Sequence, residues 1–219
     1  MLNTPCVPTT FTFNGNTSGS GTPGNIRQYT LNGISVKVSA FSRTKSSAGS
    51  VWSTAYLGSF PGGLGVTDGS EDGNGNSHTV DNIGRDNFIL FEFSQPVVID
   101  RAYLGYVSGD SDLTAWVGNA NDPFNNHLTL SNAVLAGLTA ETNTTTSSQT
   151  RWATLNAGSI SGNVLIIAAD LGDTTPDDQF KIGALEICQP SSSQVTLACV
   201  AATTGTVGQA YSSKLTPAG

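Results

Sequence analysis

Oxygen-bearing side chains are concentrated in one stretch, residues 62–93, GGLGVTDGSEDGNGNSHTVDNIGRDNFILFEF. It runs from a glycine-rich turn through an acidic loop into an apolar strand. Ca²⁺ takes carboxylate, amide and backbone carbonyl oxygens, which such a loop can supply. We therefore predict a calcium site with ligands from this loop: Asp68, Glu71, Asp81, Asn82 and Asp86. The loop lacks EF-hand spacing, so the alternative is that these side chains only make turns with the backbone.

Two other groups of acids have types that could do chemistry. By analogy with carbohydrate-binding sandwiches, residues 14–25 with Glu186 form a second possible cation position. Paired carboxylates can hydrolyse glycosides, although adjacent acids in turns are usually solvated. The pairs of suitable type are Asp110 with Asp112 and Asp177 with Asp178.

The remaining reactive residue types do not form a catalytic pattern. His78 and His127 have no cysteine or carboxylate at zinc-ligand spacing. No GxSxG motif indicates a nucleophilic serine. The sequence therefore predicts no catalytic residues, and we expect a protein that is not an enzyme.

Composition narrows the environment and the partners. Charged residues make up 11% of the chain and the formal net charge is −7. An acidic chain with few basic residues does not suit nucleic acid, because phosphate contacts need Lys and Arg. No apolar run is long enough for a membrane span, and the first residues do not read as a signal peptide. A surface rich in Gly, Ser, Thr and Asn is common in secreted β-proteins, so we expect an extracellular location.

The three cysteines are Cys6, Cys188 and Cys199. Terminal strands of a sandwich often lie side by side, so we predict a disulfide between Cys6 and Cys188. In the loop-entropy model a bridge over so long a loop is worth about 4–5 kcal/mol. The alternative is buried free thiols, and the odd Cys199 suggests a partner elsewhere.

The chemistry-bearing residues lie between strand patterns. Residues 26–31 and 34–41 predict a hairpin across Asn32-Gly33. Residues 88–93 are apolar on both faces and predict a central strand, followed by a turn at 94–96. Residues 127–138 fit a helical turn or a strand. About ten short strands with regular turn signals predict an all-β, two-sheet β-sandwich, jelly-roll-like.

The chain divides into a main domain and a short tail. We expect a β-sandwich domain at 1–190, a linker at 191–194 and an orphan strand segment at 195–219. One or two strands cannot form an independent domain. The tail is therefore predicted to dock on its own sandwich or to add a strand to a neighbouring molecule. The residues expected to anchor it are Val195, Leu197 and Val200.

Several motifs together resemble a known family: GLGV at 63–66, Asp81-Asn82, Asp86 and the strand ending at Phe93. They are similar to a family of exported bacterial β-sandwich proteins, many of which end in a Pro-Glu-Pro tail read by an exosortase. The likeness covers roughly residues 9 to 189, and this sequence does not carry that tail. The segment TGTVGQAYS, in the tail, resembles the opening of Ig-like repeats of bacterial surface proteins.

The resemblance and composition lead to one functional expectation with two alternatives. We expect a non-enzymatic structural, assembly or adhesion module of a bacterial surface, matrix or filament protein, with self-association through the tail. The alternatives are a calcium-dependent carbohydrate-binding module and a glycoside hydrolase fragment. Trp52, Trp116 and Trp152 all lie in alternating strands, so core packing is expected over sugar stacking. An exposed tryptophan beside a concave sheet would favour the carbohydrate-binding alternative.

Overall fold

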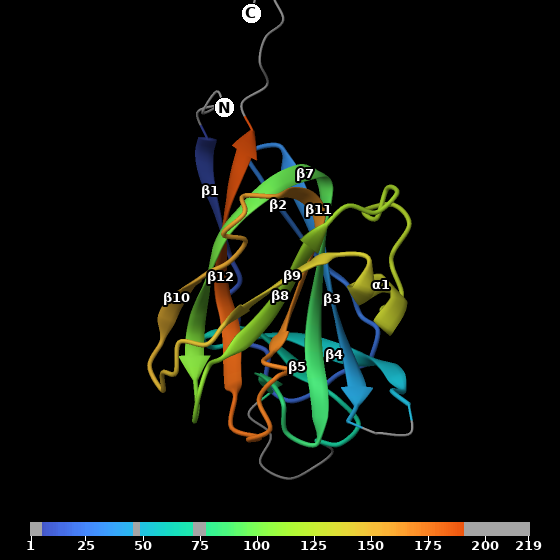
Figure 1. Ribbon diagram of the computed structural model, residues 1–219, viewed down its shortest axis with the longest axis vertical. Coiled ribbons are helices and arrows are strands. Elements are labelled where there is room, and N and C mark those ends of the chain that lie inside the picture. The colour runs from blue at the N-terminus through green and yellow to red at the C-terminus, as the bar shows by residue number, and fades with distance from the viewer. Residues whose placement is uncertain (1–5, 46–48, 72–77, 191–219) are drawn as a thin grey trace, which may run out of the picture.

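The structure, a computed structural model, describes residues 6–45, 49–71 and 78–190, with the side chains of Cys6, Val7 and Pro190 excepted. In these ranges the chain is all-β with one short helix (Figure 1). The elements are β1 (Cys6–Thr12), β2 (Arg27–Leu31), β3 (Ile34–Thr44), β4 (Trp52–Phe60), β5 (Gly63–Thr67), β6 (Val80–Asp81), β7 (Arg85–Val107), β8 (Leu113–Gly118), α1 (Asn132–Ala136), β9 (Thr139–Asn143), β10 (Arg151–Thr154), β11 (Ser161–Ala169) and β12 (Gln179–Pro190).

The strands form one sheet that closes on itself. Its order is β1-β12-β5-β4-β3-β7-β11-β8-β9, and β12 also pairs with β7, which completes a ring. The neighbouring pairs are antiparallel, including the terminal strands β1 and β12. The all-β prediction is thereby confirmed.

Strand β7 is 23 residues long and connects two parts of the sheet. Its first half lies between β3 and β11, and its second half between β12 and β10. The predicted turn at 94–96 is wrong, because the strand continues through it. The ladder with β3 ends at Phe93, so Pro96 sits where that ladder no longer needs an N–H donor.

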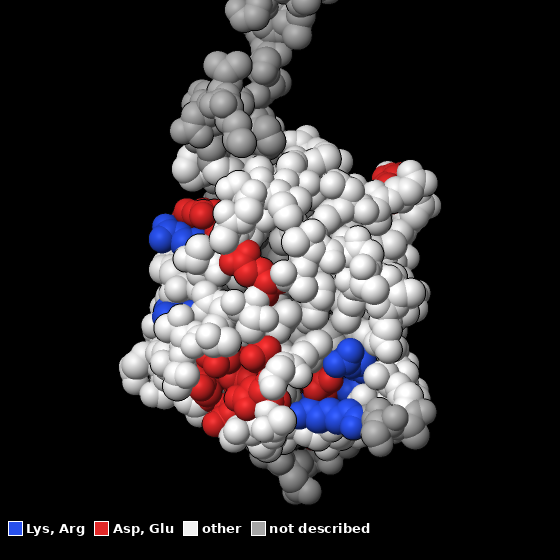
Figure 2. All heavy atoms as spheres, viewed as in Figure 1, with Lys and Arg blue, Asp and Glu red and all other residues white. Residues whose placement is uncertain are grey.

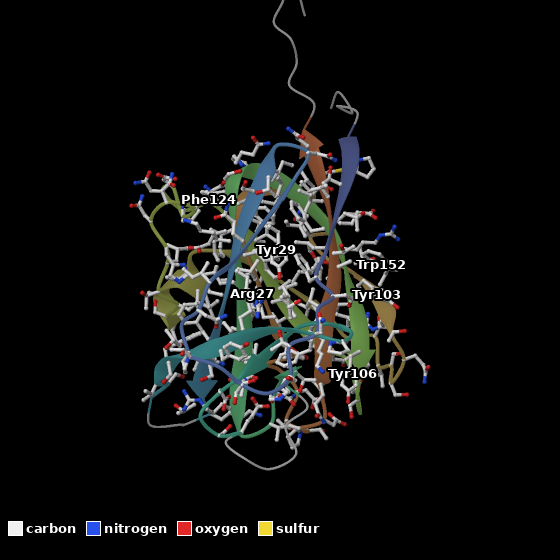
Figure 3. The ribbon with its side chains drawn as sticks, turned by 180° about the vertical axis from the view of Figure 1, so that it is seen from behind. Arg27, Tyr29, Tyr103, Tyr106, Phe124 and Trp152 are labelled. Carbon is white, nitrogen blue, oxygen red and sulfur yellow. The ribbon has the colours of Figure 1, made fainter. Side chains whose placement is uncertain are left out.

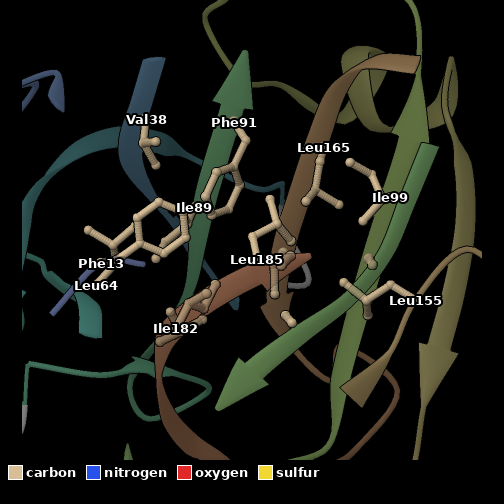
Figure 4. Close-up of a cluster of buried hydrophobic side chains, with 14 of the residues drawn as sticks. Phe13, Val38, Leu64, Ile89, Phe91, Ile99, Leu155, Leu165, Ile182 and Leu185 are labelled. Atoms are coloured by element: carbon tan, nitrogen blue, oxygen red, sulfur yellow. The ribbon is translucent and has the colours of Figure 1, made fainter. Parts of the chain in front are cut away.

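The first half of β7 is buried on both faces, as its sequence predicts. Ile89 and Phe91 face the main core inside the ring (Figure 4). Phe88 and Leu90 face the opposite way, into a smaller core that Trp116 and Leu135 also enter. That second core lies under α1, so the helix and its flanking loops cover a face that would otherwise be apolar and exposed.

Two local predictions are confirmed by the backbone. The hairpin between β2 and β3 turns at Asn32 and Gly33, whose φ angles are 51° and 77°. Both positive values suit a two-residue hairpin turn with Asn-Gly. In the ambiguous region 127–138 the helical alternative holds: Ser131 caps α1 by accepting a hydrogen bond from the N–H of Val134.

The terminal strands bring the two predicted bridge cysteines onto neighbouring strands. Cys6 lies opposite Pro190 and Pro8 opposite Cys188, so the two cysteines are two positions apart in the register of the β1–β12 ladder. Cys188 is disulfide-bonded. The Cys6 side chain lies outside the described residues, so the pairing stays a prediction. The linker, the tail with Val195, Leu197 and Val200, and Cys199 also lie outside them.

Candidate metal site

The first two predicted calcium ligands close a turn after β5. Asp68 Oδ1 accepts hydrogen bonds from the N–H and hydroxyl of Ser70, at 2.7 and 2.6 Å. Its Oδ2 accepts from the Asn87 amide at 2.7 Å, and Glu71 accepts from the N–H of Asp68 at 3.0 Å. These contacts brace the turn against β7.

Asp81 holds the next turn. Its oxygens accept from the N–H of Ile83 at 3.0 Å and the hydroxyl of Thr79 at 2.9 Å. Burial raises the pKa of Asp81 from 3.8 to about 6, and the negative charge of Asp68 adds to the rise. Asp81 is therefore a buried turn residue that keeps its proton to a higher pH than a free aspartate does.

Asp86 is engaged by cations of the protein itself. Its Oδ2 lies 2.7 Å from Nη2 and 3.2 Å from Nε of Arg43, and Lys45 Nζ is 3.8 Å from Oδ1. A bound metal ion would have to compete with both side chains. The geometry thus gives Asp86 the role of an ion-pair partner.

The carboxylates that meet at one point are Asp110, Asp112 and Asp178. Each offers an oxygen, and these oxygens lie within 4.8 Å of one another. Their residues are 9%, 8% and 0% exposed. Among the residues described, this is the one group of three such side chains close enough to share a metal ion.

Backbone pairing places the three acids together. Asp110 and Asp112 lie in the turn between β7 and β8, and Asp178 precedes β12 directly. The N–H of Asp110 donates to the carbonyl of Asp177 at 2.8 Å, and the N–H of Gln179 donates back to the carbonyl of Asp110 at 3.0 Å. The two segments are therefore held side by side before any side chain contributes.

Hydrogen bonds fix the carboxylates but leave oxygen atoms over. Asp110 Oδ1 accepts from the N–H groups of Ser111 and Ser147, at 2.7 and 2.8 Å. Asp178 Oδ1 accepts from the N–H of Asp112 at 2.8 Å. Asp112 Oδ1 is buried and finds no hydrogen-bond partner within the described part of the chain. A buried acceptor without a donor is costly, and a cation would satisfy it.

The electrostatics of the trio favour a cation or a proton. Burial first, and then the charges of Asp112 and Asp110, raise the pKa of Asp178 from 3.8 to about 7. Burial, then Asp110 and Asp170, also raise the pKa of Asp112. Figure 2 shows the acidic patch at the end of the molecule where β7 and β8 meet the start of β12.

The nearest basic side chain is held to one side of the trio. Arg151, at the start of β10, donates from Nε to the hydroxyl of Ser111 at 2.9 Å and from Nη2 to the Ser111 carbonyl at 2.7 Å. Burial lowers its pKa, while the charge of Asp112 opposes that change. Arg151 thus binds the backbone between the two acids and makes no ion pair with the trio within 4.0 Å.

Asn82 is the one predicted ligand that touches this trio. Its amide nitrogen donates to Asp178 Oδ2 at 3.0 Å and to the carbonyl of Thr175 at 3.1 Å. Its own Oδ1 is buried and has no partner among the described residues. Asn82 therefore joins the acidic loop that the sequence singled out to the carboxylate trio that the structure reveals.

The sequence contained a signal for the trio that our interpretation missed. Asp110 with Asp112 and Asp178 with its neighbour were considered only as hydrolase pairs. All three follow or precede strands at short turns, and β7 and β12 are neighbours in the sheet. Pairing these two strands correctly would have placed their end residues together.

The other chemistry-bearing residues have structural partners. His78 shares a 2.7 Å hydrogen bond with Thr67, and His127 lies 2.6 Å from the buried Glu92. In the second possible cation position, Glu186 pairs with Arg101 at 3.1 Å, and Asn25 donates to the carbonyl of Leu57. Asp100 also contacts Glu186, but the described residues bring no group of three acids together there.

The three tryptophans differ in exposure. Trp116 is buried, and Trp52 packs on Phe88 while its Nε1 donates to Asn132 at 3.0 Å. Trp152 is 38% exposed. Core packing is therefore confirmed for Trp116 and wrong for Trp152, because β10 is a short strand whose alternate residue Ala153 faces the core instead.

Comparison with protein-family models, with curated proteins and with solved structures found no match for this chain. No helix among the described residues has the length and apolar character needed to span a membrane.

Proposed function

We propose that the chain is a calcium-binding, non-catalytic β-module of an extracellular bacterial surface or matrix protein. The observation that carries calcium binding is the buried trio of Asp110, Asp112 and Asp178 with its unpartnered Asp112 oxygen. The extracellular setting is supported by the low charged fraction and by the resemblance of the sequence motifs to exported β-sandwich proteins.

Ca²⁺ suits this donor set better than other common ions. All the side-chain donors are oxygens, whereas zinc sites usually include nitrogen or sulfur. Three carboxylates can provide three to six of the six to eight oxygens that Ca²⁺ takes, and backbone carbonyls and water can complete the shell. Mg²⁺ requires a stricter octahedron and gives up its water less readily.

The burial of the trio supports a structural role over catalysis. Asp178 is fully buried, so a sugar ring could not pass between it and the other two acids. An ion here would link the end of β7, the start of β8 and the start of β12. Its binding energy would add to the stability of the folded state, because the unfolded chain lacks the site.

Calcium titration of chelator-treated protein tests this proposal. We expect Ca²⁺ to bind with measurable heat and, at a hundredfold excess over Kd, to stabilise the fold by about 2.7 kcal/mol. Asp112→Asn and Asp178→Asn should remove both effects. Asp122→Asn is the matched control, since it makes the same chemical change in an exposed loop.

Two results would count against the proposal. One is the absence of both heat and stabilisation at millimolar Ca²⁺ in the unmodified protein. The other is loss of binding in Asp68→Asn and Asp81→Asn but not in Asp112→Asn, which would return the site to the acidic loop.

A second candidate function is a calcium-dependent carbohydrate-binding module. The exposed Trp152 favours it, because an exposed indole on a sheet is a common platform for a sugar ring.

Within either function we propose that the closed sheet is a jelly-roll-like sandwich, with β7 shared between its two layers. This description is supported by the change of partners midway along β7. We also propose self-association through the tail at 195–219.

A further inference from the structure

Three aromatic side chains form a row on the outer side of β10 and β7: Trp152, Tyr103 and Tyr106. Figure 3 shows them one after another along one side of the molecule. Trp152 and Tyr106 are 38% and 36% exposed, and Tyr103 is partly exposed. We call these three residues the aromatic row.

The first two members contact each other directly. Trp152 and Tyr103 are opposite in the β10–β7 ladder, and their ring centroids are 5.3 Å apart. Arg101 places its guanidinium carbon 4.5 Å from the Trp152 ring centroid. The indole is therefore held by contacts with a tyrosine and an arginine, which limits the entropy lost when a ligand stacks on it.

The floor between Tyr103 and Tyr106 is made of glycine backbone. A Cβ on Gly183 would lie 3.1 Å from the Tyr103 ring, and a Cβ on Gly62 would lie 2.9 Å from Tyr106 Cβ. A Cβ on Gly105 would lie 2.3 Å from the carbonyl oxygen of Gly62. The backbone of Gly183 therefore lies against Tyr103, and that of Gly62 lies against Tyr106.

The charged side chains beside the row already have contacts within the protein, Asp100 with Glu186 among them. Arg101 pairs with Glu186 at 3.1 Å, and Lys181 Nζ lies 4.5 Å from the Tyr106 ring centroid. Arg151 is turned to Ser111. A surface with its charges already engaged is complementary to an uncharged ligand, and the net charge of −7 disfavours a polyanion.

We propose that the aromatic row binds an uncharged polysaccharide chain. The C–H faces of pyranose rings are apolar and slightly positive, so they match the negative faces of the Trp152 and tyrosine rings. Sugar hydroxyls would find donors and acceptors at Arg101 and Glu186, next to the indole. Three rings in a row across β10 and β7 fit a linear polymer with several consecutive sugar units.

This inference rests on the second candidate function and not on the calcium site. The calcium proposal and the polysaccharide proposal can therefore be disproved independently of each other. They share one structural link: Arg151, the residue before Trp152, is bonded to Ser111 between Asp110 and Asp112.

Native electrophoresis through gels containing a neutral soluble polysaccharide tests the proposal. The probes are a β-glucan, a xylan and a mannan, with pull-down on cellulose and chitin. We expect retardation or capture with at least one of them. Trp152→Ala should weaken binding on the order of tenfold or more, and Tyr106→Ala should weaken it by a smaller factor. Trp152→Phe should retain most of the binding.

The control is Val51→Ala, which removes an exposed apolar side chain outside the row and should leave binding unchanged. If Trp152→Ala still binds the polysaccharide as the unmodified protein does, the sugar site lies elsewhere and the proposal for the aromatic row is wrong. Binding by none of the five polysaccharides would contradict both the row and the carbohydrate-binding function, whatever the calcium titration gives. Retardation by a polyanion alone, or self-association in light scattering that Trp152→Ala abolishes, would also overturn the proposal.

Discussion

Asp178 connects the metal proposal to pH. It is fully buried, its pKa is raised to about 7, and its Oδ2 is held by the Asn82 amide. Two neighbours, Asp110 and Asp112, share its surroundings. With this raised pKa, Asp178 keeps its proton to a higher pH than a free aspartate does when no cation is present, so calcium and protons should compete for it.

The competition gives a signed prediction for stability in a chelator. Between about pH 4 and pH 7 the folded protein binds more protons at Asp178 than the unfolded chain does. The free energy of unfolding should therefore fall as pH rises through this window. Asp81 acts in the same direction up to about pH 6.

The measurement is thermal unfolding at several pH values, with EDTA and with Ca²⁺. In EDTA the melting temperature of the unmodified protein should decline across the window more steeply than that of Asp178→Asn. Saturating Ca²⁺ should remove much of this decline, since the ion replaces the proton. Equal pH slopes for the two proteins would show that Asp178 does not titrate as described.

At the level of single residues, the sequence indicated which kinds of side chain form a site better than it indicated which residues contact one another. It predicted one site from Asp68, Glu71, Asp81, Asn82 and Asp86, whereas the acids that gather are Asp110, Asp112 and Asp178, with Asn82 bonded to Asp178. It did not predict that Asp86 is paired with Arg43, because the contact depends on the register of β3 against β7. Such pairings join residues distant in sequence, and no local pattern encodes them.

Among the elements, the turn from β7 to β8 decides whether the trio can form. Gly109 has a φ of 82°, and a Cβ there would lie 2.5 Å from the carbonyl oxygen of Asp177. That same carbonyl accepts the N–H of Asp110. A side chain at this position would push apart the two segments that carry the acids.

We therefore expect Gly109→Ala to lower both stability and calcium affinity. Replacing glycine at a positive φ costs about 1 kcal/mol or more, and the clash with the backbone adds to it. Gly69→Ala is the control, because a Cβ added there would meet no atom within 4 Å and the residue has no positive φ. Calorimetric titration with Ca²⁺ and denaturant unfolding measure the two effects. Equal behaviour of the two variants would contradict the role given to this turn.

Strand β7 shows what hydrophobic patterning can and cannot predict. The sequence predicted that residues 88–93 are central, because both faces are apolar, and they lie between β3 and β11. It also predicted a turn at 94–96, since a proline after two polar residues is typical of one. The strand continues because its partners change at this point, and only the complete sheet determines that change.

For the whole molecule, the ladder between β1 and β12 closes the chain on itself. It runs from Cys6 opposite Pro190 to Thr12 opposite Ala184. The predicted disulfide between Cys6 and Cys188 would fasten the open end of this ladder. The loop-entropy model gives such a bridge about 4–5 kcal/mol.

Mass spectrometry of unreduced, alkylated protein should find Cys6 and Cys188 in one linked peptide pair. Reduction should lower the melting temperature, and the double variant Cys6→Ala/Cys188→Ala should match the reduced protein. Cys199→Ala serves as the control and should keep the linked pair. Recovery of both cysteines as free, alkylated thiols would rule the bridge out.

The same ladder determines how the module would respond to mechanical force. In Figure 1, β1 begins and β12 ends at the same end of the molecule. Tension applied to the two strands from that end pulls them apart like a zipper, so their hydrogen bonds break one after another instead of sharing the load in shear. Without a crosslink the terminal strands would peel at low force. A disulfide at the open end of the ladder would carry the tension through a covalent bond. The tension would then not reach the aspartate trio or the aromatic row.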